Sequence, residues 1–437
     1  MEEQSASRLV PTALVESTIH DEFPVIDKKS YIDRSIDKVV PSLIFPESTD
    51  LEGLSNLEFV IHQTSEHYID LSSIEIELKL TLLDGDGTRA GIVGATQVYF
   101  VNDLLQAIFP IRKVYINNTA IESCFHGSHI SRLKHLINTP NHVSENRGKI
   151  QGAFPIKSGE MKERIDAALM GAHATRISFS KQEPIHMIGP LNLDISSASK
   201  WLLDRCDVRI VLEPARAKVC INAINDDIPF KYAVKMARLH VNKIKPTPGG
   251  FLNTTKALLS NNMEYIIKRH IIKTEILPAG QSSLVFVRPF QSRIPAKLYI
   301  FMTKQDADNG SYSLDPFYYH HNNLINYKVL IDGIPLIDSD CSADEGMIKV
   351  YHDSLKAHDA ETHFIPQNIY KSGGFVICIS TNHSDIDELS FKQKGNMSIH
   401  LKFSVPLPTT QIVYLLGLVH STFEISSDRE VLSNFSY

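Results

Sequence analysis

The chain has 437 residues, of which 43% are hydrophobic and 22% are charged, and its formal net charge is -6. This length exceeds what one compact core holds and suits two domains of ~200 residues each. The acidic balance argues against sequence-independent nucleic-acid binding, which needs a surplus of Lys and Arg. Met1-Glu2-Glu3 lacks the basic start of a secretion signal, and the longest apolar run, Ile412 to Val419, is too short for a membrane span.

The cysteines are odd in number, scattered, and never spaced as C-x-x-C. They are Cys124, Cys206, Cys220, Cys341 and Cys378. A reduced thiol inside a strand behaves as a small apolar residue. We therefore expect a reducing intracellular compartment and no disulfide scaffold.

Residues 1–50 are polar, without periodicity, and are broken by Pro11, Pro24, Pro41 and Pro46. They predict an N-terminal arm that is disordered alone or lies against another surface. The first regular element predicted is a strand from Ile74 to Leu82, in which every second residue is apolar and faces the core. Asp84-Gly85-Asp86-Gly87 should end it as a turn.

One short sequence segment occurs in similar form in both halves of the chain. Residues 113–121 (KVYINNTAI) match residues 328–336 (KVLIDGIPL), and each phrase is an alternating apolar run, a turn pair and another apolar segment. Asn-Asn and Asp-Gly tolerate the positive φ of a tight hairpin, so each copy predicts strand, turn and strand.

A second pair of segments follows in the same order. Residues 207–213 alternate like residues 396–402, and each is followed by a long apolar strand, at 232–241 and at 411–419. We interpret the two matches as one β unit used twice.

Two short helices are predicted in the first half, one carrying Ile130, Leu133, Leu136 and Ile137, the other between Ser158 and Gly171. Strand patterns are predicted at 176–179 and 208–212. Residues 245–250 form the densest group of helix and strand breakers, which places a boundary there. We therefore expect a first domain at 51–245 and a second at 246–437.

The second half predicts a helical turn at 251–259 and then a series of short strands. The strands are expected at 265–276, 284–287, 297–301, 327–331 and 375–379, and residues 338–372 have no clear period and predict a long loop. Many short strands with long insertions favour an all-β fold of two tandem antiparallel jelly-roll sandwiches, with short helices in the loops.

Candidate reactive groups were weighed against simpler structural roles. Asp84 to Thr88 resembles the start of a calcium loop, but Ala95 replaces the carboxylate that the twelfth position needs, so a turn is favoured. The densest set of candidate metal ligands is His352, Asp353, His358, Asp359, Glu361 and His363. Their histidines are six and five residues apart, which does not fit one helix face, so we expect a solvated loop and no metal site.

The remaining candidates also favour packing over chemistry. His320-His321 suits a surface or interface, and the S-x-x-K pairs Ser131/Lys134 and Ser197/Lys200 lack the partner motifs of a serine hydrolase. Phe317-Tyr318-Tyr319 could form a ligand platform, but packing against a sheet or subunit is favoured. We predict no catalytic residues, no cofactor and no enzyme activity.

A series of segments in order resembles the major capsid protein of Polinton/Maverick-type elements and adintoviruses. The segments are residues 68–71, 102–105, 113–121, 187–191 with Asp194, 308–312 with 315–317, 395–396 and 423–425. Asp315 departs from the Asn expected before Pro-Phe, and residues 338–372 look individual.

The resemblance implies the double jelly-roll capsid lineage, with homotrimeric, pseudo-hexagonal capsomers in an icosahedral virion. Neighbouring capsomers and minor capsid or penton proteins would be the partners, without sequence-specific nucleic-acid binding, and contact with an internal membrane is left open. Two alternatives are a tandem β-sandwich binding module, such as a lectin or receptor-binding spike, and a cupin-like metalloenzyme.

Overall fold

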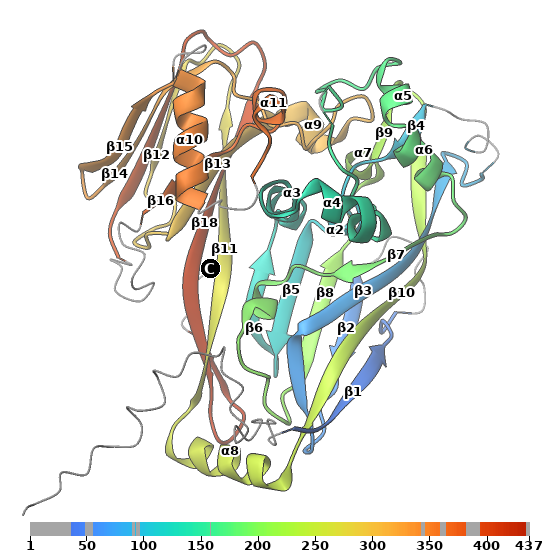
Figure 1. Cartoon of the computed structure of the whole chain (residues 1–437), viewed down its shortest axis with the longest axis vertical. Helices are drawn as coiled ribbons and strands as arrows, with labels where there is room; N and C mark the ends of the chain where they lie inside the picture. Colours follow the sequence, from blue (N-terminus) through green and yellow to red (C-terminus); the bar gives the residue numbers. More distant parts are fainter. Residues whose placement is uncertain are drawn as a thin grey trace, which may run out of the picture.

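The computed structural model describes residues 36–48, 56–89, 92, 97–157, 159–341, 346–358, 364–381 and 394–433. Two antiparallel β-sandwiches lie side by side in the one chain, and helix α8 (Pro248–Ser260) joins them at the base (Figure 1). The predicted all-β class with short helices in the loops is confirmed.

The first sandwich is built from two four-stranded sheets, with strand orders β1-β10-β3-β7 and β2-β8-β5-β6. The strands are β1 (Ile36–Ile44), β2 (Leu57–Ile61), β3 (Tyr68–Asp84), β5 (Ile111–Ile116), β6 (Thr119–Cys124), β7 (Ile185–Pro190), β8 (Val208–Glu213) and β10 (Phe230–Pro246). A separate small sheet pairs β4 (Val98–Phe100) with β9 (Ile221–Ala223).

The second sandwich repeats this topology, with strand orders β11-β18-β13-β16 and β12-β17-β14-β15. Its strands are β11 (Met263–Leu277), β12 (Ser283–Val287), β13 (Lys297–Lys304), β14 (Leu324–Ile331), β15 (Ile334–Asp340), β16 (Ile377–Ser380), β17 (Met397–Phe403) and β18 (Gln411–Ile425), and β19 (Val431–Ser433) extends the sheet beside β18. Taken in chain order, each strand has the same sheet neighbours as its counterpart in the first sandwich. The predicted pair of tandem jelly rolls is therefore confirmed.

The recurring phrase forms the same hairpin twice, as β5–β6 and as β14–β15. Its turn residues have positive φ in both copies: 45° and 66° at Asn117 and Asn118, 51° and 81° at Asp332 and Gly333. In each copy the first turn side chain accepts a hydrogen bond from the start of the neighbouring strand. Asn117 Oδ1 accepts from the Asp207 N–H at 2.9 Å, and Asp332 Oδ1 accepts from the Asn396 N–H at 2.8 Å. The repeat thus preserves this hydrogen bond as well as the strand-turn-strand pattern of the hairpin.

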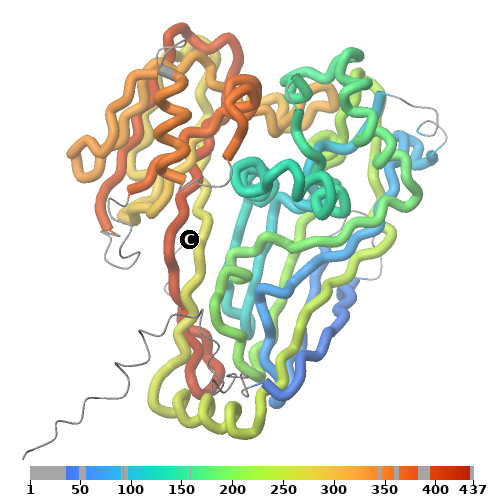
Figure 2. Tube along the Cα trace, viewed as in Figure 1, coloured from blue at the N-terminus to red at the C-terminus, as the bar shows by residue number. Residues whose placement is uncertain are grey.

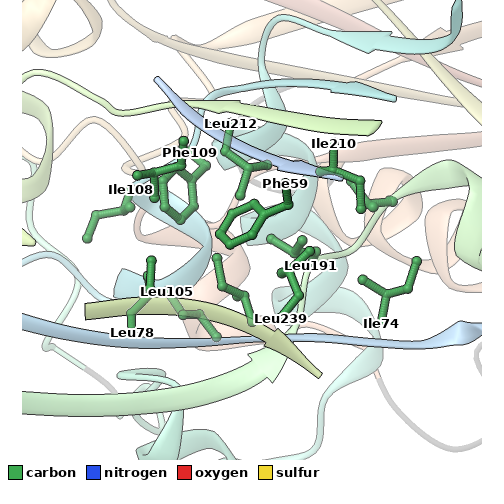
Figure 3. Packing of buried hydrophobic residues seen from close by; sticks show 14 of the residues in the cluster. Phe59, Ile74, Leu78, Leu105, Ile108, Phe109, Leu191, Ile210, Leu212 and Leu239 are labelled. Carbon is green, nitrogen blue, oxygen red and sulfur yellow. The ribbon is translucent and has the colours of Figure 1, made fainter. Parts of the chain in front are cut away.

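The core of the first sandwich lies between its two sheets. The predicted alternation in β3 is confirmed, because Ile74, Ile76, Leu78, Leu80 and Leu82 are all at most 1% exposed. Figure 3 shows Phe59 of β2 and Leu212 of β8 facing Leu78 and Leu239 of the opposite sheet. Burial of such aliphatic and aromatic side chains stabilises a fold by roughly 1.5–3 kcal/mol for each side chain.

The predicted helix around Ile130 is confirmed as α3 (Gly127–Asn138), and the one after residue 250 is α8, in which Pro248 occupies the first turn. The prediction of a strand at 176–179 is wrong: these residues lie in α6 (Ala174–Ser180). Arg176 and Ser180 are buried one helical turn apart, and the Ser180 hydroxyl donates to the Arg176 carbonyl at 2.7 Å. The buried face of this helix includes polar side chains, so the sequence shows no clear apolar period of a helix.

The predicted helix between Ser158 and Gly171 is also wrong over most of its length, since only α5 (Leu169–Ala172) is helical. Residues 163–165 instead lie against the second sandwich. The Ile165 N–H donates to the Ser313 carbonyl at 2.8 Å, and the Asp315 N–H donates to the Glu163 carbonyl at 2.9 Å. A contact between distant segments therefore overrides the local helical pattern.

The long loop predicted at 338–372 contains regular structure. β15 continues to Asp340, and helices α10 (Gly346–His358) and α11 (Gln367–Lys371) follow. Met347, Val350 and Ser354 are buried at helical spacing, and the positions between them are a mixture of apolar and polar residues, with Ile348 exposed. A serine at a core position weakened the apolar period in the sequence.

The described part of the predicted arm contains strand β1, which pairs antiparallel with residues 239–246 of β10. The expectation that no regular element precedes Ile74 is therefore wrong for β1 and for β2. Pro41 hid the strand in the sequence, and an edge strand tolerates a proline because one side of it is unpaired. Residues 1–35 lie outside the described residues.

The remaining short elements fill the loops. They are α2 (Leu104–Ala107), α4 (Asn141–Val143), η3 (Ser144–Gly148), η4 (Asp194–Ser197), α7 (Ala217–Cys220) and α9 (Gln305–Gly310). Within the described ranges, no helix combines the length and apolarity needed to cross a bilayer.

The hairpin turns generate a first prediction. Gly333→Ala forces an L side chain into a φ of 81° and should destabilise the protein by about 1–2 kcal/mol, which lowers the melting temperature. Gly249→Ala is the matched control: its site in α8 has open space around the added methyl group, so stability should stay or rise. Calorimetry measures the melting temperatures of the two variants. Equal melting temperatures would contradict the role of the turn in stability.

Candidate functional site

Only part of the predicted set of candidate metal ligands lies among the described residues. His352 and Asp353 lie on α10, and Asp359, Glu361 and His363 fall outside the described residues. The His358 ring is used in packing, because its Nε2 lies 2.9 Å from the Asn138 side-chain oxygen. Among the residues that the structure describes, no group of three or more His, Cys, Asp or Glu side chains is suited to hold a metal.

The calcium-like segment is a turn, as favoured from the sequence. The Asp84 carboxylate accepts from the Thr88 N–H and from the Thr88 hydroxyl, both at 2.8 Å. The serines of the two S-x-x-K pairs are hydrogen-bond acceptors: Ser131 accepts from Arg112 at 3.1 Å, and Ser197 accepts from the Lys268 N–H at 2.8 Å. Both serines therefore have structural roles.

The aromatic triplet packs inside the protein. Phe317 and Tyr319 are at most 2% exposed, and the Tyr319 ring lies 4.8 Å from that of Phe301. The preferred interpretation of this group as packing is confirmed. His320 lies 3.8 Å from Glu163 of the first half, and burial lowers the pKa of His320 to about 4. This part of the histidine pair belongs to a contact between the halves.

All five cysteines are free thiols. Burial raises the pKa of Cys124, Cys206, Cys220 and Cys341 to about 12. Such thiols stay protonated at neutral pH and are poor nucleophiles.

One contact between the two halves is the seam, which we define as the contact of residues 263–270 of β11 with residues 194–203 and β6 of the first sandwich. β11 and β18 run as a long pair down the flank of the first sandwich (Figures 1 and 2). The Tyr265 hydroxyl donates to the Trp201 carbonyl at 3.0 Å and accepts from the Leu203 N–H at 3.2 Å. Tyr265 also stacks on Phe423 of β18, with ring centroids 4.8 Å apart. Both side chains belong to the apolar core of the first sandwich.

A buried ionic cluster lies at the upper end of the seam. Asp194 receives the His270 N–H at 3.0 Å, and its other oxygen lies 2.5 Å from His270 Nδ1. Glu122 of β6 accepts from the Asp194 N–H at 2.8 Å. Arg112 fills the space behind this pair and donates to the carbonyls of residues 106, 109 and 191. The guanidinium of Arg269 donates to the Ile121 carbonyl.

The pKa values of the two buried carboxyl groups are shifted in opposite directions. Burial and the nearby Asp194 charge raise the pKa of Glu122 to about 8. Burial alone would raise the pKa of Asp194, but the facing His270 and its hydrogen bonds hold that pKa below its usual value. The opposite shifts favour a pair that shares one negative charge, because two adjacent buried carboxylates would repel each other.

Helix α3 forms a second contact between the halves. His129 lies against the ring of Tyr414, with centroids 4.7 Å apart, and its Nε2 is 2.9 Å from an Asp308 oxygen. The Tyr414 hydroxyl donates to the same oxygen at 2.6 Å. Ile130 and Leu133 of this helix belong to the apolar core of the second sandwich. Each sandwich therefore contributes side chains to the core of the other.

Two flanks of the part of the chain that the structure describes carry exposed apolar side chains. On the edge strand β1 and just after it, Val39 is 46% exposed, Leu43 40% and Phe45 61%. On the edge strand β15, Ile334 is 72% exposed. An open strand edge with apolar side chains is suited to bind another protein surface. The sequence analysis missed both flanks, because it did not assign β1 and placed β15 partly in a loop.

Comparison with known proteins gives one short match at the sequence level. No family model matches the chain. The uncharacterized protein F54H12.2 of Caenorhabditis elegans is 24% identical over 129 residues, which is 29% of this chain and 31% of that protein. The chain thus spans less than a third of the length of this relative.

Solved structures match over nearly the whole length. A chain of the 3.5 Å cryo-EM structure of the Sputnik virophage matches with a TM-score of 0.60 at 11% identity, covering 99% of this chain and 94% of that one. The Faustovirus major capsid protein matches with a TM-score of 0.60 at 9% identity, covering 95% and 94%. The mavirus major capsid protein matches with a TM-score of 0.51 at 9% identity, covering 100% and 96%. These likenesses establish the fold, the double jelly roll.

The ionic cluster generates a second prediction. The pKa of Glu122 rises from about 4.3 in the unfolded chain to about 8 in the folded protein. The folded state therefore binds the extra proton, and wild-type stability should fall as pH rises between these values. Glu122→Gln removes this titration, so its melting temperature relative to wild type should rise from pH 5 to 8 and then level off.

Asp194→Asn is the contrasting variant. It removes the charge that faces His270, and breaking such a buried pair costs about 3–5 kcal/mol. Its melting temperature should be below that of wild type across the same range. If the melting temperature of Glu122→Gln changed with pH in parallel with that of wild type, this would contradict the raised pKa of Glu122.

Proposed function

We propose that the chain is a structural capsid subunit, the major capsid protein of an icosahedral DNA virus or virus-like element, and that it is not an enzyme. The observation that carries this proposal is the full-length match of both sandwiches to solved major capsid proteins. The repeat explains why the fold suits this work. Each copy of a chain with two similar sandwiches contributes two similar units to a lattice. A small number of copies can therefore form a hexagonal unit.

We propose a homotrimer as the capsomer. Three copies would place six sandwiches in a ring of pseudo-sixfold symmetry. A permanent trimer should bury more than ~2,000 Å² at each interface. Contacts between neighbouring capsomers can be weak individually, because many of them act together in a closed shell.

The finer assignments are also part of the proposal. The ordered series of segments that begins at residue 68 supports the Polinton/Maverick and adintovirus lineage, and the site of action would be the virion. The partners would be further copies and minor capsid or penton proteins. The negative net charge of -6 supports leaving genome contact to other proteins.

The domain division supports the same architecture. We propose residues 1–50 as an arm, 51–245 as the first jelly roll and 246–437 as the second. β10 ends at Pro246 and β11 begins at Met263, with α8 between them, which supports the boundary. Strand β1, although within the arm, belongs to the first sheet.

The third prediction tests this function. The purified chain should sediment as a trimer and, when overexpressed, form hexagonal tiles or closed particles in electron micrographs. A stable monomer that forms neither would contradict the proposal.

The fourth prediction concerns the arm. Deletion of residues 2–34 leaves β1 intact and should preserve the trimer, whereas shell formation should be impaired because the arm is proposed to bind a neighbour. Sedimentation and particle yield measure the two effects separately. Normal particle yield from the truncated chain would contradict the role of the arm.

A further inference from the structure

A cavity of about 160 Å³ opens among the loops of the first half, away from the seam. Its lining comes from α3, from residues 145–157, from residues 160–176 and from Asp315 of the second half. For comparison, a cavity of about 150 Å³ is large enough to bind benzene. The cavity can therefore hold a small ligand at a point where the two halves meet.

Two buried arginines line this cavity. Arg132 of α3 is 3% exposed, and Arg176 of α6 is 8% exposed. The Nε and Nη1 atoms of Arg132 are enclosed and have no hydrogen-bond partner, and neither arginine forms an ion pair with any described residue. Arginine is almost never buried unless its charge is paired, because removing the charge from water is costly. The arrangement is therefore typical of a site that binds an anion.

The nearest carboxyl groups of the chain are already engaged. Burial raises the pKa of Asp103 to about 6, and the charges of both Arg132 and Arg112 oppose that rise, so Asp103 faces two arginines. Asp315 Oδ1 accepts a hydrogen bond from the Phe317 N–H of its own loop at 2.9 Å. The arginines of the cavity thus keep donor groups that the chain itself does not use.

The inner part of the cavity is positively charged and held in place. Burial lowers the pKa of Arg176, and the nearby charge of Arg132 acts in the same direction. The Arg176 guanidinium lies 5.0 Å from the centre of the Tyr99 ring. His173 adds no charge: its Nδ1 lies 2.7 Å from the Tyr99 hydroxyl, its Nε2 lies 3.0 Å from the Glu160 carbonyl oxygen, and burial lowers the pKa of His173 to about 4.

The mouth of the cavity carries exposed side chains of both signs. Lys149, Lys157 and Glu145 all line it and are exposed. A lysine is a mobile point charge on a long stem, so it can turn toward a bound anion. The buried arginines therefore set the preference of the site for anions, and the lysines can add to it.

The chemistry of these groups favours a phosphate over a carboxylate. The fork of an arginine matches both anions, with two parallel hydrogen bonds. A phosphate monoester has three free oxygens and a charge of about -1.5 to -2 at neutral pH. It can therefore face two guanidinium groups and an ammonium group at once, whereas a carboxylate has two oxygens and a single charge.

We propose that this cavity binds the phosphate group of a small-molecule anion, with Arg132 and Arg176 at the inner end and Lys149 at the mouth. The inference goes beyond the proposed capsid function and does not depend on it.

Isothermal titration of the full chain in phosphate-free buffer tests the site. The probes are orthophosphate, pyrophosphate and ATP, with malonate at matched ionic strength as the carboxylate probe. At least one phosphate probe should bind saturably and more tightly than malonate. The order of the three affinities distinguishes free phosphate from a phosphate group at the end of a larger molecule.

Three variants locate the binding. Arg132→Met removes the fork but keeps most of the side-chain volume, and it should weaken phosphate binding roughly 10–100-fold. Lys149→Gln should weaken it about two- to fivefold, because this lysine is exposed. Lys256→Gln is the matched control: Lys256 is an exposed lysine on α8 at the base of the molecule, far from α3 and α6, and binding should not change (Figure 1).

Saturable phosphate binding that Arg132→Met weakens and Lys256→Gln preserves supports the site. Three results overturn it: no saturable binding of any phosphate probe, equal affinity for malonate, or an unchanged affinity in Arg132→Met. The melting temperature verifies that each variant is folded. If Arg132→Met does not fold, the comparison of Lys149→Gln with Lys256→Gln decides, and equal affinities of these two variants overturn the site. None of these results depends on assembly, so a failure here leaves the capsid function in place.

Discussion

The architecture depends on covering the open edges of its sheets. A sandwich of eight strands leaves its first strand with one unpaired side, and unpaired strand edges with apolar side chains bind whatever they meet. Inside this chain the edge of β11 is covered by residues 194–203 and β6. The contact is fixed by Tyr265, which belongs to the core of the first sandwich while its backbone belongs to the second. The two sandwiches are thereby held in one relative orientation, and that orientation determines where the remaining edges lie.

The buried polar groups of the seam add specificity to this apolar contact. Isolated charges are expensive in an interior, and a buried ion pair is weak support for stability. The Asp194 carboxylate reduces that cost with the hydrogen bonds from His270, and the raised pKa of Glu122 disfavours a second charge beside it. Such groups permit few alternative registers, because a shift of one residue would leave them without partners. A subunit that assembles as proposed needs one orientation in every copy.

Much of the fold was predictable, because its main signals are local. The hairpin turns at Asn117 and Asp332 follow from residues that tolerate positive φ, and the alternation of β3 follows from its buried face. The repeated phrase then gave the two-sandwich architecture. The errors have two causes. Contacts between distant segments decided the path of residues 163–165 and the existence of β1, to which β10 supplies hydrogen bonds. Polar side chains at buried helix positions concealed the period of α6, which buries an arginine and a serine, and of α10. The seam itself joins residues more than sixty positions apart, such as Leu203 and Tyr265, and no spacing in the sequence marks that pairing.

A three-dimensional reconstruction of the purified particle by electron microscopy tests the central claim most directly. The account predicts a closed shell whose capsomers each hold three copies, with six sandwiches in a ring. A particle with another number of copies in each capsomer, or a chain that forms no shell, would contradict it.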